Sequence, residues 1–284
     1  MNNLNMKKKE KTSVSVLVII IIFLLGMLLL LYPAVSNYVA EINVSNKSTE
    51  YANTMTELSD EEIEEEWQKA IDYNNSLKGN PVKDPFVEGS GVALPSNYTS
   101  VLGFDDGVMG YISIPEINVY IPIRHGTSDE VLEEGAGHIF QTSFPVGGEG
   151  NHSVITAHTG YPRATLFNRL TELIEGDKFV IYILDKKATY EVDHIEVIEP
   201  DDIDQLVAVK GKDYITLVTC TPYGVNSHRL LVRGTRIPNE DDEGIPEYEA
   251  PFPWNIIVMV TVCLSLLIIF IIVVRKRYRR RISK

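Results

Sequence analysis

Two long runs of apolar residues lie near the two ends of the chain. Residues 14–31 are almost unbroken Val, Ile, Leu and Phe, and residues 256–274 form a second run with only mildly polar interruptions. A helix of about 20 apolar residues, rising about 1.5 Å per residue, crosses the hydrocarbon core of a bilayer. The pattern therefore predicts two transmembrane helices, which we place at residues 14–31 and 254–274.

The first run has an alternative interpretation as a cleaved signal peptide, because several lysines precede it. A run of this length exceeds a usual signal-peptide core, and a clean small-x-small cleavage pattern is missing. We therefore expect the segment to be retained as an anchor, although Ala34-Val35-Ser36 leaves cleavage open.

The segment between the two runs changes from a helical to a strand pattern. Residues 33–56 are polar and predict a spacer. A capping box of Ser59 and Glu62 then begins an amphipathic helix that we expect to end near Gly79. From Val108 onward, short β-branched and aliphatic runs alternate with turn residues. We expect strands at residues 109–115, 119–124, 151–157, 178–184, 188–197, 214–220 and 229–237, with a short helix at 166–176.

The distribution of charged residues predicts how the chain is oriented in the membrane. Of the 26 basic residues, four precede the first apolar run and seven follow the second. The positive-inside rule keeps both basic tails, residues 1–13 and 275–284, in the cytoplasm and residues 33–253 outside. The outer part then holds 15 basic and 38 acidic residues, a net charge near −23. Such an acidic domain lacks the basic patch that nucleic-acid binding needs.

The last two predicted strands form a hairpin with a thiol and a cation at the same end. Cys220 closes the first strand and Arg229 opens the second. A nearby positive charge favours the nucleophilic thiolate, and a guanidinium can hold a carbonyl oxygen as negative charge develops on it. Cys263 lies in the second apolar run, so Cys220 is the one thiol outside the membrane and no disulfide can form there. The plain alternative is a buried cysteine beside a solvated arginine.

Three stretches of this region resemble the sortases, cysteine transpeptidases of Gram-positive cell surfaces. Residues 216–220, TLVTC, are similar to the TLxTC signature, and Arg229 falls where the family keeps its arginine. Residues 155–160, ITAHTG, resemble the histidine segment and point to His158. The continuation TPYG, followed by HRLLVRG, is most similar to the pilus-building class C. The resemblance covers residues 108–237.

This resemblance implies a fold and a reaction. Short strands with few helices favour a sandwich or a closed barrel, and the family selects a mostly β, closed eight-stranded barrel. Cys220 would attack the Thr–Gly carbonyl of an LPxTG-like sorting signal, His158 would transfer protons, and Arg229 would steady the oxygen. A lysine amine of a pilin subunit would then accept the acyl group. No metal or organic cofactor is expected.

Other histidines compete with His158 for the role of base. His228 adjoins Arg229, but neighbouring strand residues point to opposite faces, so the two cannot both face the site. A zinc site of His152 and His158 is conceivable, although nothing else supplies ligands at metal spacing.

A proline-rich stretch before the barrel contains Asp84-Pro85-Phe86. Class C sortases carry an Asp-Pro-aromatic lid in this part of the chain, which the tripeptide resembles. By this resemblance Asp84 would pair with Arg229 and Phe86 would cover the sulfur of Cys220. An ordinary surface turn is the alternative.

The predicted organisation places an extracellular spacer, helix and lid at residues 32–107, the catalytic barrel at 108–238 and an acidic linker at 239–253. Three other functions stay open. A housekeeping sortase would anchor proteins to peptidoglycan but would usually lack the lid-like tripeptide and the second span. An L,D-transpeptidase would place Gly before its cysteine, where Thr219 stands. A binding protein without catalysis would not need Cys220.

Overall fold

The computed structural model describes residues 2–77, 94–104, 107–161, 165–200, 202, 204–239 and 252–282. The chain separates into two compact units. The first comprises Met1–Val39 with Pro251–Lys284, and the second comprises Ala40–Ala250. The predicted Asp84-Pro85-Phe86 lid lies outside the described residues.

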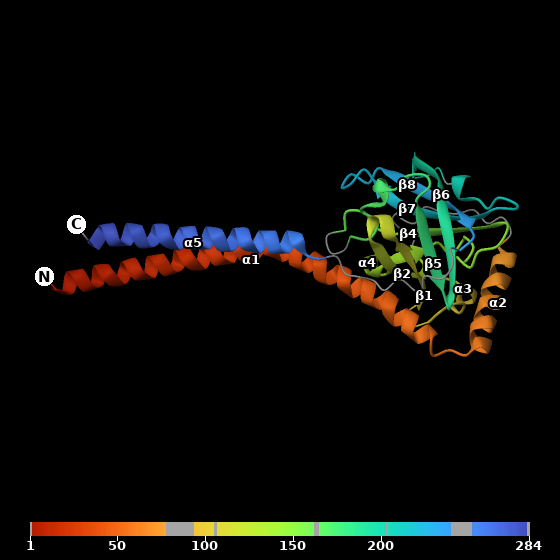
Figure 1. Ribbon diagram of the computed structural model, residues 1–284, viewed down its shortest axis with the longest axis horizontal. Helices are drawn as coiled ribbons and strands as arrows, with labels where there is room; N and C mark the ends of the chain where they lie inside the picture. Colours follow the sequence, from red (N-terminus) through yellow and green to blue (C-terminus); the bar gives the residue numbers. More distant parts are fainter. Residues whose placement is uncertain are drawn as a thin grey trace. The chain divides into compact units, whose positions relative to one another are not determined.

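The first unit consists of two apolar helices, the beginning of α1 (Asn2–Met55) and α5 (Trp254–Ile282). Both are long and apolar enough to cross a membrane. They run alongside each other in Figure 1, and the rings of Phe23 and Phe270 stack with centroids 5.1 Å apart. The two apolar runs in the sequence therefore form helices, as predicted.

Helix α1 continues through the segment that we expected to be a spacer, and that expectation is wrong. Residues 40–55 of α1 belong to the second unit, where the helix buries one face against the strands. Ser45 donates to the carbonyl of Tyr120 (3.1 Å), and the Tyr51 hydroxyl donates to the carbonyl of Met109 (2.8 Å). Polar residues that look like a linker in the sequence thus form a docked helix through tertiary contacts.

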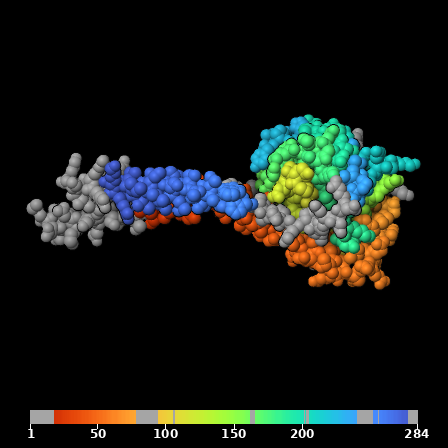
Figure 2. Space-filling view, in the orientation of Figure 1, coloured from red at the N-terminus to blue at the C-terminus, as the bar shows by residue number. Residues whose placement is uncertain are grey.

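Helix α2 (Asp60–Ser76) begins at the predicted capping box. The Ser59 hydroxyl accepts from the backbone N–H of Glu62, and the Glu62 carboxylate accepts from the backbone N–H of Ser59. Its C-terminal turn is fastened to the barrel, because the Asn74 side chain pairs with both the N–H and the carbonyl of Phe144. Figure 2 shows α2 and the end of α1, both in orange, covering one side of the barrel.

Eight strands close into a barrel in the spatial order β1-β2-β3-β4-β7-β8-β6-β5. The predicted closed barrel is therefore confirmed. The parallel pairs are β2 with β3 and β4 with β7, and the remaining neighbours are antiparallel. The strands are β1 (Val108–Ile114), β2 (Val119–His125), β3 (Ala136–His138), β4 (Asn151–Thr156), β5 (Lys178–Ile183), β6 (Lys186–Ile198), β7 (Asp213–Thr221) and β8 (His228–Ile237).

Short helices fill the connections. They are α3 (Ser96–Thr99), α4 (Asp129–Glu134), and the 3-10 helices η2 (Pro115–Ile117), η3 (Leu170–Glu172) and η4 (Asp204–Leu206). The helix expected at residues 166–176 is reduced to a turn and η3. Leu166 has a positive φ of 38°, which no regular right-handed helix allows.

The two faces of β4, β7 and β8 bury different clusters. Ile155, Leu217 and Val232 belong to the main core. Alternate residues point the other way, and they form a second cluster with the β3–β4 and β6–β7 connections. This outer cluster consists of Ile139, Val154, Ile198, Leu206, Val218 and Leu231.

Candidate active site

The β7–β8 hairpin brings together the two predicted residues of the last strands. Cys220 is directly paired with Arg229 across the antiparallel ladder. Directly paired residues project on the same face of a sheet, so the thiol and the guanidinium share one face. Both side chains are buried, with 8% and 6% of their surfaces exposed. The face is that of the outer cluster, because Val218 and Leu231 lie two residues before Cys220 and two after Arg229.

The parallel pairing of β4 with β7 brings His158 to the same level. Every pair in this ladder is offset by 62 residues, and the last pair is Thr156 with Val218. The ladder extends one residue further, since Ala157 N donates to the Val218 carbonyl (3.2 Å). His158 is the next residue, and the same register continued by one more position would set it beside Cys220. We call His158, directly after β4, together with the paired Cys220 of β7 and Arg229 of β8, the thiol row.

The environment of His158 favours the neutral imidazole. Burial lowers the pKa of His158, and the carboxylates of Asp129 and Glu133 on α4 oppose this effect. The ring of Tyr161 stacks on the imidazole, with centroids 5.7 Å apart and planes 17° from parallel. A neutral imidazole can accept a proton near neutral pH, so His158 is suited to work as a general base.

Backbone carbonyls orient Arg229. Its Nη1 donates to the carbonyl of Asn226 (3.2 Å) and to that of His228 (3.1 Å). The connecting loop is folded back on itself, because the N–H groups of Val225 and Asn226 both donate to the Pro222 carbonyl (3.0 Å each). A planar guanidinium is a fork of five N–H donors, the kind of group that can hold a carbonyl oxygen.

The structure separates the other candidate histidines from this row. His228 is paired with Thr221 and lies on the opposite face from Arg229, where it forms a 3.2 Å contact with Glu199. Among the described residues no group of three or more His, Cys, Asp or Glu side chains could hold a metal ion.

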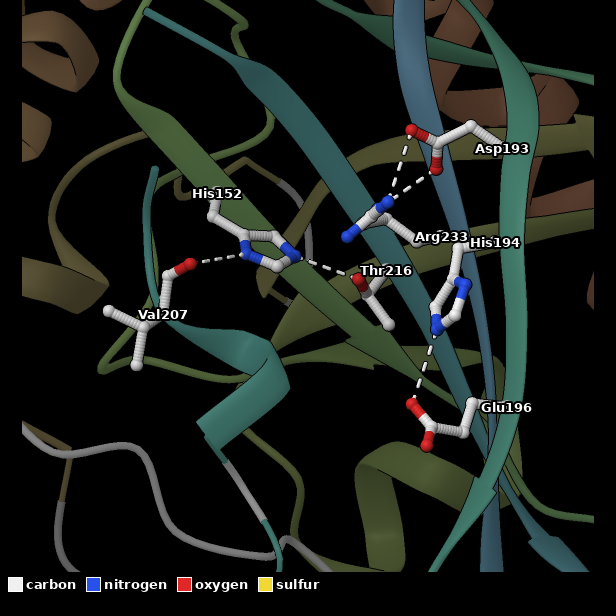
Figure 3. A network of polar contacts seen from close by, with 7 residues as sticks. All are labelled: His152, Asp193, His194, Glu196, Val207, Thr216 and Arg233. Carbon is white, nitrogen blue, oxygen red and sulfur yellow. Dashed lines mark hydrogen bonds and ion pairs between the residues drawn. The ribbon is translucent and has the colours of Figure 1, made fainter. Parts of the chain in front are cut away.

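His152 belongs to a second polar group on the same sheet face, shown in Figure 3. Its Nε2 lies 2.7 Å from the Thr216 hydroxyl and its Nδ1 lies 3.1 Å from the Val207 carbonyl. A carbonyl can only accept, so Nδ1 carries the proton and Nε2 accepts from Thr216. Burial lowers the pKa of His152 to about 4. Both ring nitrogens are therefore engaged by protein atoms, which argues against the zinc alternative.

An ion pair completes this second group. Arg233 donates to both carboxylate oxygens of Asp193 (2.9 and 3.3 Å), and its guanidinium lies 4.4 Å from the centroid of the Tyr214 ring. We call His152, Thr216 and Arg233 the hydroxyl row. Sequence reasoning considered His152 as a competing base and as a zinc ligand. It missed this network, because the partners come from four different elements.

Sequence reasoning also missed the residues that hold the segment after β4. Thr219 Oγ1 donates to the Ala157 carbonyl (2.8 Å), and Gly160 N donates to Asn168 Oδ1 (2.6 Å). The positive φ of Gly160, 75°, signals a turn here, and the His-Thr-Gly spacing was the available clue.

Comparison with known proteins gives a consistent picture. The family model described as the sortase domain matches residues 112–237. Sortase D of Bacillus subtilis (strain 168) is 30% identical over 131 residues, which are 45% of this chain and 63% of the relative. The chain thus spans about three-fifths of the length of this curated relative.

Solved structures are similar over a longer part of the chain. The crystal structure of sortase C-1 from Actinomyces oris is 47% identical, with a TM-score of 0.60, and the match covers 63% of this chain and 99% of that one. The pilus-related sortase C of group B Streptococcus is 43% identical, with a TM-score of 0.62, and the match covers 68% and 96%.

Proposed function

Because this chain belongs to the sortase family, and within it to class C, we propose that it is a membrane-anchored transpeptidase that builds covalent pili. The observation that carries this proposal is the thiol row, in which Cys220 and Arg229 are direct partners on β7 and β8 and His158 follows β4, the parallel neighbour of β7. Acyl transfer needs three groups: a nucleophile, a proton carrier and a hydrogen-bond donor that stabilises the oxyanion.

In the first step His158 takes the proton of the Cys220 thiol, and Sγ attacks the carbonyl carbon of the Thr–Gly bond of an LPxTG-like sorting signal. The carbonyl oxygen takes up negative charge, which Arg229 stabilises by hydrogen bonds. His158 gives its proton to the leaving glycine amine, the C–N bond breaks, and a thioacyl enzyme remains.

In the second step an amine attacks the thioacyl carbon. His158 takes the proton of this amine, the C–S bond breaks with Cys220 leaving as the thiolate, and His158 returns the proton to the sulfur. The acceptor that we propose is a lysine of a pilin subunit, so the product is an isopeptide bond. Similarity to the pilus-related sortase C supports this choice of acceptor over peptidoglycan. The reaction consumes no cofactor.

We further propose that both termini are cytoplasmic and that the barrel lies outside the cell. The basic residues cluster at the two chain ends beyond the apolar segments. Tyr32 and Trp254, with 69% and 67% of their surfaces exposed, stand at the opposite ends of these segments, where aromatic side chains mark a membrane interface. The lid of Asp84, Pro85 and Phe86 remains part of this proposal as a gate over the thiol row.

The test uses the full chain in detergent with an LPxTG-type peptide and intact-mass detection. We expect a peptide adduct on the wild type and none on Cys220→Ala. A double variant, Asp84→Ala with Phe86→Ala, should form the adduct faster if the lid gates the site. An adduct that persists in Cys220→Ala would contradict the proposed nucleophile.

The acceptor is tested separately with the preformed adduct. We expect transfer to a peptide that carries a pilin-type lysine, and slower transfer to the amine of a peptidoglycan stem peptide. The reverse preference would favour the housekeeping function.

A further inference from the structure

The backbone around His158 is held from two sides. On one side Thr219 of β7 donates to the Ala157 carbonyl (2.8 Å). On the other side the turn at residues 165–169 supplies two contacts, because Phe167 N donates to the His158 carbonyl (3.2 Å) and Gly160 N donates to Asn168 Oδ1 (2.6 Å). The carbonyl before the histidine, its own carbonyl and the N–H two residues later are all engaged.

The side chain of Asn168 links the turn at residues 165–169 to the segment that follows His158. Its Oδ1 accepts from both the Gly160 N–H and the Thr159 hydroxyl (3.3 Å). The Thr159 side chain is buried, so loss of its acceptor would leave a hydroxyl to be satisfied inside the protein. One oxygen atom therefore fixes both residues that follow the histidine.

The position of this contact matters because the β4–β7 ladder ends just before the histidine. Beyond the bond from Ala157 N to the Val218 carbonyl, the chain turns at Gly160, whose φ is 75°. The direction of the imidazole then depends on where this turn is held. The stacked ring of Tyr161 is carried by the same segment, so a shift of the turn would move both rings.

We propose that Asn168 is a positioning residue that sets the imidazole of His158 against Cys220 through the 158–160 turn. This inference rests on the proposed function of His158 as proton carrier. An error of about 1 Å in the position of a catalytic group costs about a hundredfold in rate. Asn168 does not titrate, so it contributes geometry without adding charge near the histidine.

The chain offers a matched control at the other end of the barrel. Asn239 Oδ1 likewise accepts from a backbone N–H and a threonine hydroxyl, both of Thr189 (3.1 and 3.2 Å). Thr189 pairs with Ile237 at the end of β8, whereas Arg229 lies at its beginning. Asn239→Ala removes the same kind of contact, together with bonds to Arg236 and to the Lys187 carbonyl, far from the thiol row.

The kinetic experiment compares four forms of the full chain in detergent: wild type, Asn168→Ala, Asn168→Asp and Asn239→Ala. We expect Asn168→Ala to lower kcat for peptide transfer about 10- to 100-fold with KM within about twofold, because substrate contacts remain. Asn168→Asp keeps the acceptor oxygen and should recover most of kcat. Its added negative charge raises the pKa of His158, so the histidine limb of the pH profile should move to higher pH. Asn239→Ala should leave kcat and the pH profile unchanged.

A second readout does not depend on activity. Spectra of ¹⁵N-labelled histidine resolve the six histidines, and His158→Gln assigns the signal of interest. We expect the His158 ring signals alone to shift or broaden in Asn168→Ala, and to titrate at higher pH in Asn168→Asp. Unchanged His158 signals and an unchanged pH profile in both variants would overturn the inference, even if thermal stability falls.

The two readouts separate the possible failures. A wild type that forms no peptide adduct refutes the proposed function, while the histidine spectra still decide whether Asn168 positions His158. An active wild type with normal kcat in Asn168→Ala refutes the positioning role and leaves the transpeptidase function standing.

Discussion

The thiol row and the hydroxyl row occupy the same face of the same three strands, yet their contacts differ. His152 has both ring nitrogens bound by Thr216 and Val207, and only 2% of its surface is exposed. His158 is half-buried and holds a stacking contact with Tyr161. A histidine whose two nitrogens are committed to fixed partners in the interior serves the fold.

The arginine of the hydroxyl row is held by side chains. Asp193 neutralises Arg233 through two hydrogen bonds, and Tyr214 lies under its guanidinium. Arg229 donates to the backbone carbonyls of Asn226 and His228 at the beginning of β8. A histidine, a small nucleophile-like group and an arginine on neighbouring strands therefore do not make a catalytic site by composition alone. The partners of each group decide its role.

Substitution of each histidine by glutamine should give the largest difference between the two rows in activity and in stability. His158→Gln removes the proposed proton carrier and should slow peptide transfer about 10²- to 10⁴-fold with little change in thermal stability. His152→Gln should leave transfer per folded molecule within a few-fold and lower the free energy of unfolding by about 1–3 kcal/mol, because buried hydrogen bonds are lost. Adduct formation by mass spectrometry and urea unfolding measure the two effects. Equal loss of activity in both variants would erase the distinction between the rows.

The two arginines should give a smaller contrast. Arg229→Lys keeps the charge but loses the planar fork, and we expect acylation about 10- to 100-fold slower. Arg233→Lys should cost about 1 kcal/mol of stability, through the lost second bond to Asp193 and weaker stacking on Tyr214, with acylation unchanged. The test follows single-turnover acylation and the unfolding midpoint of each variant. A slow Arg233→Lys enzyme of normal stability would show that the hydroxyl row also serves the reaction.

The smallest effect is a pH dependence of stability that belongs to His152. Its folded-state pKa, about 4, lies below the ordinary value of 6.5, so the unfolded chain binds the proton more tightly. Its stabilising contribution is complete above the ordinary value and is lost as the pH falls toward 4. Between pH 6 and pH 5 this loss amounts to about 1 kcal/mol.

Unfolding by urea at both pH values, on wild type and His152→Gln, isolates this contribution. The charges that face His152 are Arg233, which lowers its pKa, and Asp193, which raises it. Both remain in the variant. An equal pH dependence in the two proteins would mean that His152 is not held neutral by the fold.

Local patterns predicted much of the architecture, and the failures have physical causes. The capping box at Ser59, the β7–β8 hairpin and most strands lie where the sequence put them, because each depends on residues close in the chain. The spacer at residues 33–56 and the helix at 166–176 were wrong, since packing of α1 against the barrel and the turn at Leu166 are tertiary effects. Strand β3 (Ala136–His138) was not predicted, because its three residues carry no strand pattern of their own.

The sequence by itself determined the two apolar spans and the pairing of Cys220 with Arg229, because hydropathy and a hairpin are local properties. The strand pattern alone did not distinguish a β-sandwich from a closed β-barrel, and the family resemblance was needed to choose the barrel. Only the tertiary structure revealed the partners of His152, which are Val207 and Thr216. The register of β4 against β7 pairs His152 with Tyr214, and its imidazole reaches Thr216. The same offset of 62 residues, continued past the end of β4, would set His158 beside Cys220.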